Sequence, residues 1–515
     1  MDIITAILLL ICIVALLYWK YRQIIKWADV IPGYEEPFSE KPSVKALFAS
    51  RERRMELTME RATKYPRIYR IYFDLWPKVM LTDPELVKVA LTSTKCLKKP
   101  DFYRFFGWGA GLVTAPVDSW KVHRKLLNPA FGVGAVHSFI PVFDQCSKEF
   151  AKILEPHIDG KEFDLLDYSV KATLDSICAT SFGVKVDAQK KKLEFNKYLQ
   201  RVHEIVAMRV TKIQLRPDFV FRFTKYFKEN IHVRNECIKF GDKLIEQRKS
   251  MIKNDQKLEI CEENDDDIPQ KPKIFVDHLL KGDGCHFTES EIRDHVFTTI
   301  SAGNETTALA IANTILFIAI HPDIQERLVE ELQQVFYDES IEIDIDQLSK
   351  LKYMEMVLKE VLRLCPSVPA WARETTDDMY IDGYRIPKGT EMIFVGYAIH
   401  RRKEDWGPDP GKFDPDRFLP ENSANRHPYS YLPFSAGSRN CIGKRYAMIS
   451  LKIMLTNLLM SYKFKTSLKW SDIKWKMDIH LHITKPHSVS IEKREFFTPV
   501  QNIFEKYQNR FCVER

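Results

Sequence analysis

The chain has 515 residues, of which 45% are hydrophobic and 29% are charged. These proportions describe a globular protein with a large core and exclude a disordered, collagen-like or coiled-coil chain. Lys and Arg (77) exceed Asp and Glu (70) by only seven, and no segment concentrates this positive charge, so we expect no binding to nucleic acid.

The first predicted element is the apolar segment from Ile3 to Trp19, in which only Thr5 is polar. As a helix it is roughly 25 Å long, the short end of what spans a bilayer core. A cleaved signal peptide would carry positive charge before the segment and small residues after it, whereas here Asp2 precedes it and Tyr18 and Trp19 close it. We therefore predict a retained membrane anchor and its basic flank over residues 1–27, with the rest of the chain on the cytoplasmic side because basic residues follow the anchor: Lys20, Arg22 and Lys26.

The patterns beyond the anchor predict a mainly α protein with small β portions, in the α+β class. Pro32-Gly33 breaks the chain directly after the anchor. Helical periodicity appears around residues 136–155, 185–210, 230–250 and 323–336. Strand-like segments are short: Ile68–Phe73, Tyr380–Ile386 and Glu391–Val395. Residues 253–272 are acidic and poor in apolar side chains, which predicts a surface loop.

One long helix is predicted from a capping box at Thr288 and Glu291 to the stop at Pro322. Its middle contains Gly303 and Glu305, which are unusual inside a buried helix. Glycine costs about 1 kcal/mol relative to alanine there, and a buried carboxylate is expensive unless it is paired. Such departures concentrate at functional sites.

Near the carboxyl end, Cys441 lies four residues after Gly437 and two before Gly443, ahead of a helical pattern from about Arg445. This spacing indicates a tight turn in which backbone N–H groups and the helix end stabilise a thiolate. Such a sulfur suits a single soft ligand to haem iron, with Arg439 facing a haem propionate. Zinc would need three more ligands and a nucleophilic cysteine a histidine, neither of which the local sequence offers; a structural turn is the remaining alternative.

With these residues the chain resembles the cytochrome P450 family, the haem-thiolate monooxygenases, over nearly its whole length. The motif Phe-x-x-Gly-x-Arg-x-Cys-x-Gly is complete from Phe434 to Gly443. Three further segments follow the family's order: Trp120–Arg124 is similar to its Trp-x-x-x-Arg helix, Lys359–Arg363 to its Glu-x-x-Arg helix, and Phe413–Phe418 to its Pro-Glu-Arg-Phe element with Asp in place of Glu.

The resemblance implies the cytochrome P450 fold, with one large catalytic domain over residues 28–515 and an amino-terminal transmembrane helix. It makes Cys441 the axial ligand of the iron in a haem b. It assigns haem contacts to Trp120, Arg124, Gly303, Arg373, Phe434, Arg439 and Gly443, although an exposed sheet-edge arginine is the alternative for Arg373. It assigns a structural ion-pair network that supports the cysteine loop to Glu360, Arg363 and Arg417.

The resemblance also gives the central helix a catalytic purpose. Gly303 leaves room for dioxygen, and Glu305 and Thr306 match the family's acid–alcohol pair, which delivers protons for O–O cleavage. Donation from the Cys441 thiolate favours the same cleavage. The alternative for Thr306 is a hydroxyl that bonds back to a helix carbonyl.

The branch that the chain resembles most is the family 4 clan of microsomal forms, especially the insect ones. Many members of that clan carry glutamate at the position of Ala302, where it esterifies a haem methyl. Alanine cannot form that ester, so we expect non-covalently bound haem. The departure also weakens any inference towards terminal hydroxylation of fatty acids.

The expected function is insertion of one oxygen atom from dioxygen into a small apolar substrate. The substrate classes left open are fatty-acid-like molecules, terpenoids and foreign compounds. Electrons are expected from NADPH through a flavoprotein reductase, with cytochrome b5 as a possible second donor. The protein is expected at the endoplasmic reticulum membrane. Substrate contacts are expected in residues 102–111, 300–306 and 368–372, with Phe105, Phe106, Trp108 and Trp371 forming an aromatic pocket. A reductase-facing basic surface is expected at Lys121, Lys125, Lys444 and Arg445.

Two alternatives stay open. One is a haem-thiolate isomerase or dehydratase that uses no dioxygen, and the other is a non-catalytic carrier of haem or of a ligand. Both would lack a reason to keep Glu305 and Thr306 together.

Overall fold

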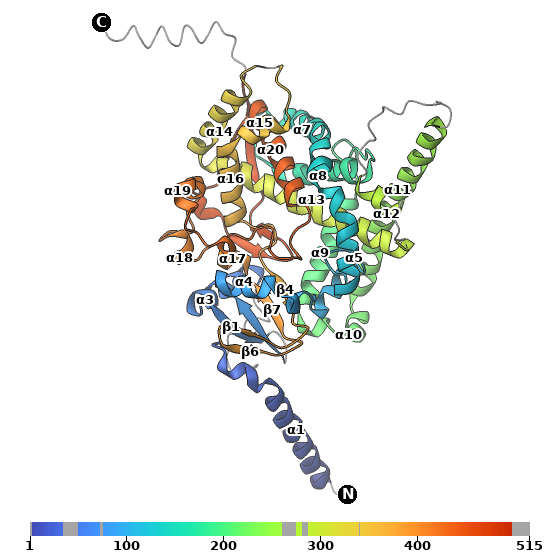
Figure 1. The fold of residues 1–515 in the computed structure, drawn as a ribbon, viewed down its shortest axis with the longest axis vertical. Helices are drawn as coiled ribbons and strands as arrows, with labels where there is room; N and C mark the ends of the chain where they lie inside the picture. The colour runs from blue at the N-terminus through green and yellow to red at the C-terminus, as the bar shows by residue number, and fades with distance from the viewer. Residues whose placement is uncertain are drawn as a thin grey trace, which may run out of the picture.

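The computed structural model describes residues 3–33, 50–72, 76–259, 274–280, 287–338 and 340–496. Its first helix, α1 (Ile3–Ile25), projects away from the body of the molecule beside the end that carries the main sheet (Figure 1). The most apolar stretch of Ile3–Val30 has a mean hydropathy of 2.5 and is not buried, so α1 has the length and composition of a membrane span. The other helix with such a composition, α13 (Glu289–Ile320), is mostly buried inside the protein and is a core helix.

Helices form most of the body (Figure 1). The longer ones are α3 (Arg51–Lys64), α4 (Pro84–Thr92), α5 (Val117–Leu127), α7 (Ile140–Leu154), α8 (Leu165–Phe182), α9 (Phe195–Thr211), α11 (Lys225–Glu259), α14 (Pro322–Val335), α16 (Lys352–Leu364) and α20 (Lys444–Ser461). The shorter ones are α6 (Val133–Ser138), α10 (Asp218–Arg222), α12 (Phe275–Leu280), α15 (Ile345–Lys350), α17 (Gly396–Ile399), α18 (Lys403–Trp406) and α19 (Pro420–Ser423).

The strands form small sheets. The largest has the order β1-β2-β7-β4, made of β1 (Ile68–Tyr72), β2 (Pro77–Leu81), β7 (Glu391–Phe394) and β4 (Trp371–Glu374). In it β2 and β7 run parallel and the other pairs antiparallel. The remaining strands are β3 (Phe163–Asp164), β5 (Met379–Ile381), β6 (Tyr384–Ile386), β8 (Tyr462–Lys465), β9 (Trp475–Met477), β10 (Leu481–Ile483) and β11 (Ser488–Lys493). The predicted fold class, mainly α with small β portions, is confirmed.

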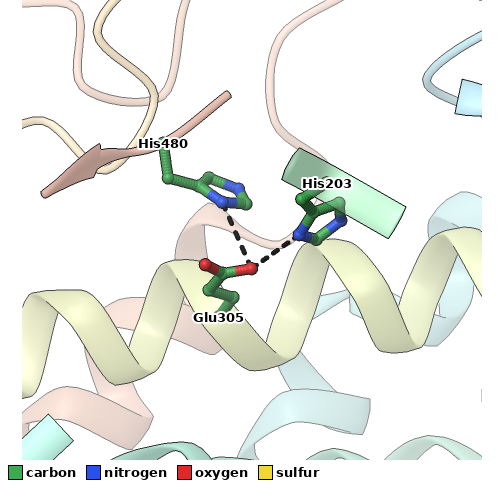
Figure 2. Close-up of side chains that lie close together, drawn as sticks. All are labelled: His203, Glu305 and His480. Atoms are coloured by element: carbon green, nitrogen blue, oxygen red, sulfur yellow. Dashed lines mark hydrogen bonds and ion pairs between the residues drawn. The ribbon is translucent and has the colours of Figure 1, made fainter. Parts of the chain in front are cut away.

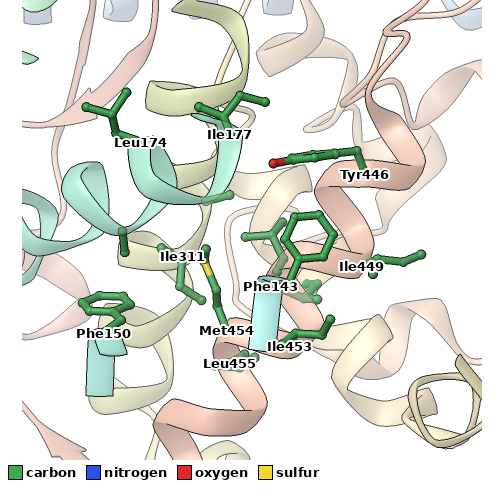
Figure 3. Packing of buried hydrophobic residues seen from close by; sticks show 14 of the residues in the cluster. Phe143, Phe150, Leu174, Ile177, Ile311, Tyr446, Ile449, Ile453, Met454 and Leu455 are labelled. Carbon is green, nitrogen blue, oxygen red and sulfur yellow. The ribbon is translucent and has the colours of Figure 1, made fainter. Parts of the chain in front are cut away.

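The main core is built around α13, which packs against α8, α16 and α20. Residues 308–318 of α13 are buried on every side, as expected for a helix that crosses the interior of a large domain. Close to α13, Ile177 of α8, Phe143 of α7 and Tyr446 of α20 pack together with Ile311 (Figure 3). The capping box predicted at the start of α13 is present, since Thr288 and Glu291 each accept a hydrogen bond from the other's backbone N–H.

Two predicted boundaries are wrong. The helix predicted over 185–210 begins only at Phe195, because Asp187 has a φ of 55° and closes a turn in which its carbonyl accepts bonds from Lys190 and Lys191. The loop predicted over 253–272 begins later, because α11 continues to Glu259. Residues 260–272 lie outside the described part of the chain, as does Phe73 of the first predicted strand.

Candidate functional site

The cysteine loop before α20 is fixed by close backbone contacts. The N–H of Cys441 donates to the carbonyl of Phe434 at 3.0 Å. Gly437 has a φ of 71°, and a Cβ there would lie 2.0 Å from the carbonyl oxygen of Leu91. Both the left-handed conformation and the close approach to α4 therefore require glycine at this position. Gly443 is the N-cap of α20, so the sulfur lies just ahead of a helix amino terminus, as the spacing predicted.

The Cys441 thiol combines two properties. Burial among protein atoms raises its pKa, while the Gly443 N–H, Arg124 and Lys444 act in the opposite direction and favour the thiolate. The residue nevertheless keeps an exposed surface, so the surrounding side chains leave part of it uncovered. A deep-lying, partly uncovered cysteine with cationic neighbours has the chemistry of a single thiolate ligand.

The middle of α13 also has an uncovered face. Ala302 is exposed and Thr306, one turn later, is half-buried, whereas Ser301, Asn304 and Thr307 around them are buried. Residues four apart lie on the same face of a helix, so this face is a continuous surface that protein side chains leave open.

A cluster of cations lies beside the cysteine loop. A guanidinium nitrogen of Arg373 donates to the carbonyl of Arg439 at 3.3 Å, and the Arg439 guanidinium lies 4.3 Å from the centre of the Trp120 ring. Arg439 donates to the carbonyl of Ala115, but its Nε and Nη1 are buried without a partner. Burial and Arg373 lower the pKa of Arg439 to about 9.

Lys99 is a third member of this cluster. Burial, together with Arg373 and Arg439, lowers the pKa of Lys99 well below its usual value. Within the described part of the chain none of the three cations has a carboxylate partner. Buried, unpaired guanidinium groups call for an anion, and two haem propionates fit this donor set. Lys99 was not predicted, because the sequence does not distinguish it from Lys98, which pairs with Glu374 at the surface.

Arg124 ties α5 to the cysteine loop. Its guanidinium donates to the backbone carbonyl of Asn440 at 2.8 Å and to the Asn440 side chain at 2.9 Å. A third bond, from Nε, goes to Asn128 at 2.8 Å. The predicted contact of Arg124 with a propionate stays a prediction, and the structure adds a role in holding the residue before Cys441.

The predicted ion-pair network is assembled. Arg363 and Glu360 make a two-bond pair, with both N···O distances at 2.7 Å and both side chains fully buried. Arg417 lies 3.6 Å from the same carboxylate, which also accepts the N–H of Asp414 at 2.9 Å. Arg363 further donates to the carbonyls of three later residues: His400, Pro410 and Lys412.

His400 connects this network to the cysteine loop. It was not predicted, because no sequence motif includes it. Its Nδ1 donates to the carbonyl of Arg363 at 3.1 Å, and its Nε2 accepts the N–H of Leu432 at 2.7 Å. Burial and Arg363 lower the pKa of His400 to about 3, so the neutral ring that both bonds need is maintained. The network thus reaches a residue two positions before Phe434.

The predicted acid–alcohol pair is not assembled as a direct contact. The Glu305 carboxylate lies 2.6 Å from His203 and 3.3 Å from His480 (Figure 2). Burial alone would raise the pKa of Glu305, but these two histidines outweigh it and hold the pKa well below its usual value. The Thr306 hydroxyl donates to the carbonyl of Ala302 at 2.6 Å, which is the back-bonded alternative. His203 and His480 were missed because they are far from Glu305 in the sequence.

The packing of α13 against α8 explains why position 303 is a glycine. A Cβ at this position would lie 2.9 Å from the terminal methyl of Ile177 on α8. The glycine therefore permits the close approach of α8 and α13, and its role beside dioxygen stays a prediction.

The aromatic residues expected to line one pocket separate into two groups. The rings of Phe106, at the end of η3 (Asp101–Phe106), and Trp108 lie 4.7 Å apart and tilted in the main core. Trp371 instead stacks on Phe394 at 6.0 Å within the core of the main sheet. The single aromatic pocket stays a prediction.

Comparisons with known proteins agree on one family. The family model described as Cytochrome P450 matches residues 38–489. The chain is 33% identical to cytochrome P450 4c21 of Blattella germanica, over 93% of this chain and 97% of that protein. It is 35% identical to cytochrome P450 4c3 of Drosophila melanogaster, over 77% and 76% of the two chains, and 32% identical to human cytochrome P450 4V2, over 77% of each.

Proposed function

Because this chain belongs to the cytochrome P450 family of haem-thiolate monooxygenases, we propose that it oxidises a small apolar substrate at the endoplasmic reticulum membrane, with electrons from NADPH through a flavoprotein reductase. The observation that carries the proposal is the partly exposed Cys441 beside the buried guanidinium groups of Arg373 and Arg439 and the half-buried Lys99. Among the described residues, these three cations have no carboxylate partner. The haem is bound non-covalently, and we propose Cys441 as its axial ligand.

The residues around the site have distinct roles in this proposal. Bound haem supplies the activation of dioxygen. Arg373, Arg439 and Lys99 neutralise the two propionates, which explains why these cations lie together. The Trp120 ring packs against the Arg439 guanidinium. The ion pairs of Glu360 with Arg363 and Arg417 fix the segment that leads into the cysteine loop.

We also propose how the chain is placed. Residues 1–27 anchor it in the membrane, because the apolar part of α1 is exposed, and residues 28–515 form one catalytic domain. Lys20, Arg22 and Lys26 follow the apolar segment Ile3–Trp19, so the catalytic domain lies on the cytoplasmic side. The substrate is apolar in this proposal because Phe105 and Phe106 of η3 and the neighbouring Trp108 form an aromatic group, in which the Trp108 ring lies 6.2 Å from that of Phe297 on α13.

The experiment that tests this proposal is a reductase-coupled assay on the full-length protein in lipid vesicles. A mixed lipid and terpenoid library is first screened for binding by the spectral shift of the haem. For each compound that binds, we expect consumption of NADPH and dioxygen together with one oxygenated product. Turnover without NADPH and dioxygen would support an isomerase or dehydratase, and binding without turnover would support a carrier.

Replacing Thr306 by alanine should uncouple the reaction. The hydroxyl donates to the Ala302 carbonyl on the uncovered face of α13, and by turning away from that carbonyl it can instead donate its proton to the reacting oxygen. We expect product formed per NADPH to fall by about tenfold or more, since general acid catalysis contributes roughly 10²-fold or more. Hydrogen peroxide released per NADPH should rise in parallel.

The matched control is Thr307→Ala, because Thr307 is the neighbouring threonine and is buried in the core. Both variants should keep the haem spectrum. Equal coupling in Thr306→Ala and the unmodified protein would mean that Thr306 only packs.

Reversing charge on the cysteine side of the molecule should slow electron delivery. Lys121 and Lys125 of α5 and Lys444 and Arg445 of α20 are exposed, and none has an ion pair among the residues that the structure describes. The bonds of Arg124 to Asn440 hold the two helices at one surface. An unpaired basic surface suits an acidic reductase face.

In the double variant Lys125→Glu, Lys444→Glu, reduction of the haem by the reductase should be about tenfold slower at low salt. The difference should disappear at high salt, because exposed charges are screened beyond roughly 10 Å at 0.1 M. Stopped-flow reduction under carbon monoxide measures this rate, with the exposed α11 pair Lys249→Glu, Lys253→Glu as control. Equal slowing in both double variants would argue against a docking surface at α5 and α20.

A further inference from the structure

Three elements that are distant in the sequence bring ligand-type side chains to one point (Figure 2). His203 comes from α9, Glu305 from α13, and His480 from the turn between β9 and β10. Their ligand atoms, the two Nδ1 nitrogens and a carboxylate oxygen, all lie within 4.8 Å of one another. Both histidines are buried. His482 of β10 adds a fourth group, with its Nε2 3.6 Å from the second oxygen of Glu305.

The spacing suits a tetrahedral metal ion. Zinc bonds of roughly 2.0–2.1 Å place neighbouring ligand atoms roughly 3.3 Å apart. The His480 Nδ1 lies 3.3 Å from Glu305 Oε2, whereas the shorter His203 distance of 2.6 Å would have to open. Two histidines and one glutamate are a ligand set that zinc uses in proteins, and imidazole nitrogen is preferred by zinc over magnesium or calcium.

The surroundings orient the ligands and give access to them. The other ring nitrogen of His203 lies 2.8 Å from the hydroxyl of Ser301, which fixes the ring as outer partners do around bound metals. A cavity of about 70 Å³ borders the group and is also lined by two carboxylates, Glu204 and Asp478, and by two cations, Arg51 and Lys476.

We propose that His203, Glu305, His480 and His482 form a binding site for Zn²⁺ that clamps α9 and the β9–β10 hairpin onto α13. The site shares Glu305 with the expected acid–alcohol pair, and none of its members is among the expected haem contacts. Zinc would replace the hydrogen bond between His203 and Glu305, so that His203 donates from its other nitrogen to Ser301.

The clamp reaches the catalytic surface through a short chain of contacts. The N–H of Leu481, next to His480, donates to the carbonyl of Ser367 at 3.1 Å. The Ser367 hydroxyl in turn donates to the carbonyl of Thr306 at 2.8 Å. Fixing the hairpin therefore also restrains the backbone of α13 at Thr306.

The test uses the purified haem-loaded protein after treatment with a chelator. We expect one Zn²⁺ per chain by metal analysis, a higher melting temperature with zinc but not with Mg²⁺ or Ca²⁺, and X-ray absorption at the zinc edge with nitrogen and oxygen ligands at roughly 2.0 Å. The absorption edge of zinc is read separately from that of the haem iron. Absence of stoichiometric zinc, or sulfur ligands at the zinc edge, would overturn the proposal.

Variants locate the ion. His203→Ala and His480→Ala should each weaken zinc affinity by at least about tenfold in a competition titration, since even outer partners of a metal site cost 10- to 100-fold. The control His232→Ala removes an exposed histidine of α11 and should leave the affinity unchanged. Only variants that keep the haem spectrum are compared, and His482→Ala is available if a buried variant does not fold. Unchanged zinc affinity in the folded variants would show that the four residues form an ion-free hydrogen-bond network.

Discussion

Replacing Cys441 by serine should abolish the thiolate-type absorption band of the reduced carbon monoxide complex. Cys441 combines an exposed surface with a helix amino terminus and the cations Arg124 and Lys444. A serine hydroxyl is a far weaker ligand, so the variant should lose all turnover that depends on the thiolate. Because serine is nearly the same size, the fold should survive, which circular dichroism checks.

The matched control is Cys365→Ser. Cys365 is buried, and its sulfur accepts a bond from the side-chain amide of Asn313 at 3.1 Å, which serine can preserve. This variant should keep the thiolate-type band. Persistence of that band in Cys441→Ser would remove the basis for the haem site described here.

The second large effect is expected from Glu360→Ala. The substitution leaves the fully buried Arg363 without its carboxylate, and removing one partner of a buried pair typically costs about 3–5 kcal/mol. It also frees the N–H of Asp414 and the guanidinium of Arg417 from their shared acceptor. We expect a lower free energy of unfolding in urea and a low haem content, because the segment before the cysteine loop loses its support.

A surface pair with the same sequence spacing provides the control. Arg53 and Glu56 are also three residues apart on a helix, at 2.8 Å, but both are largely exposed, and Arg53 also pairs with Glu60. Glu56→Ala should therefore change stability little. Similar losses in the two variants would show that burial of the Glu360–Arg363 pair has no special role.

The parts of the site that could be predicted from the sequence are local. The cysteine loop depends on Gly437 and Gly443 at fixed spacings, and Glu360 and Arg363 are one helical turn apart, so the sequence contains both arrangements. The start of α13 was predictable for the same reason, since a capping box needs only Thr288 and Glu291.

The remaining parts depend on tertiary contacts. His203, Glu305 and His480 meet because α9 and the β9–β10 hairpin both reach α13, and no periodicity signals that. Likewise, the sequence treats Lys98 and Lys99 as equivalent, although only Lys99 joins the cations next to the cysteine loop. Residues 185–194 look helical until the turn at Asp187 interrupts them.

The most direct test of the central claim is the fate of labelled dioxygen. The full-length protein, its reductase, NADPH and a compound that binds in the spectral screen are incubated under ¹⁸O₂, and the product is analysed by mass spectrometry. We expect the product to gain one ¹⁸O atom. Cys441→Ser serves as an inactive control. An oxygenated product that takes its oxygen from water, or labelled product from Cys441→Ser at the unmodified rate, would contradict this expectation.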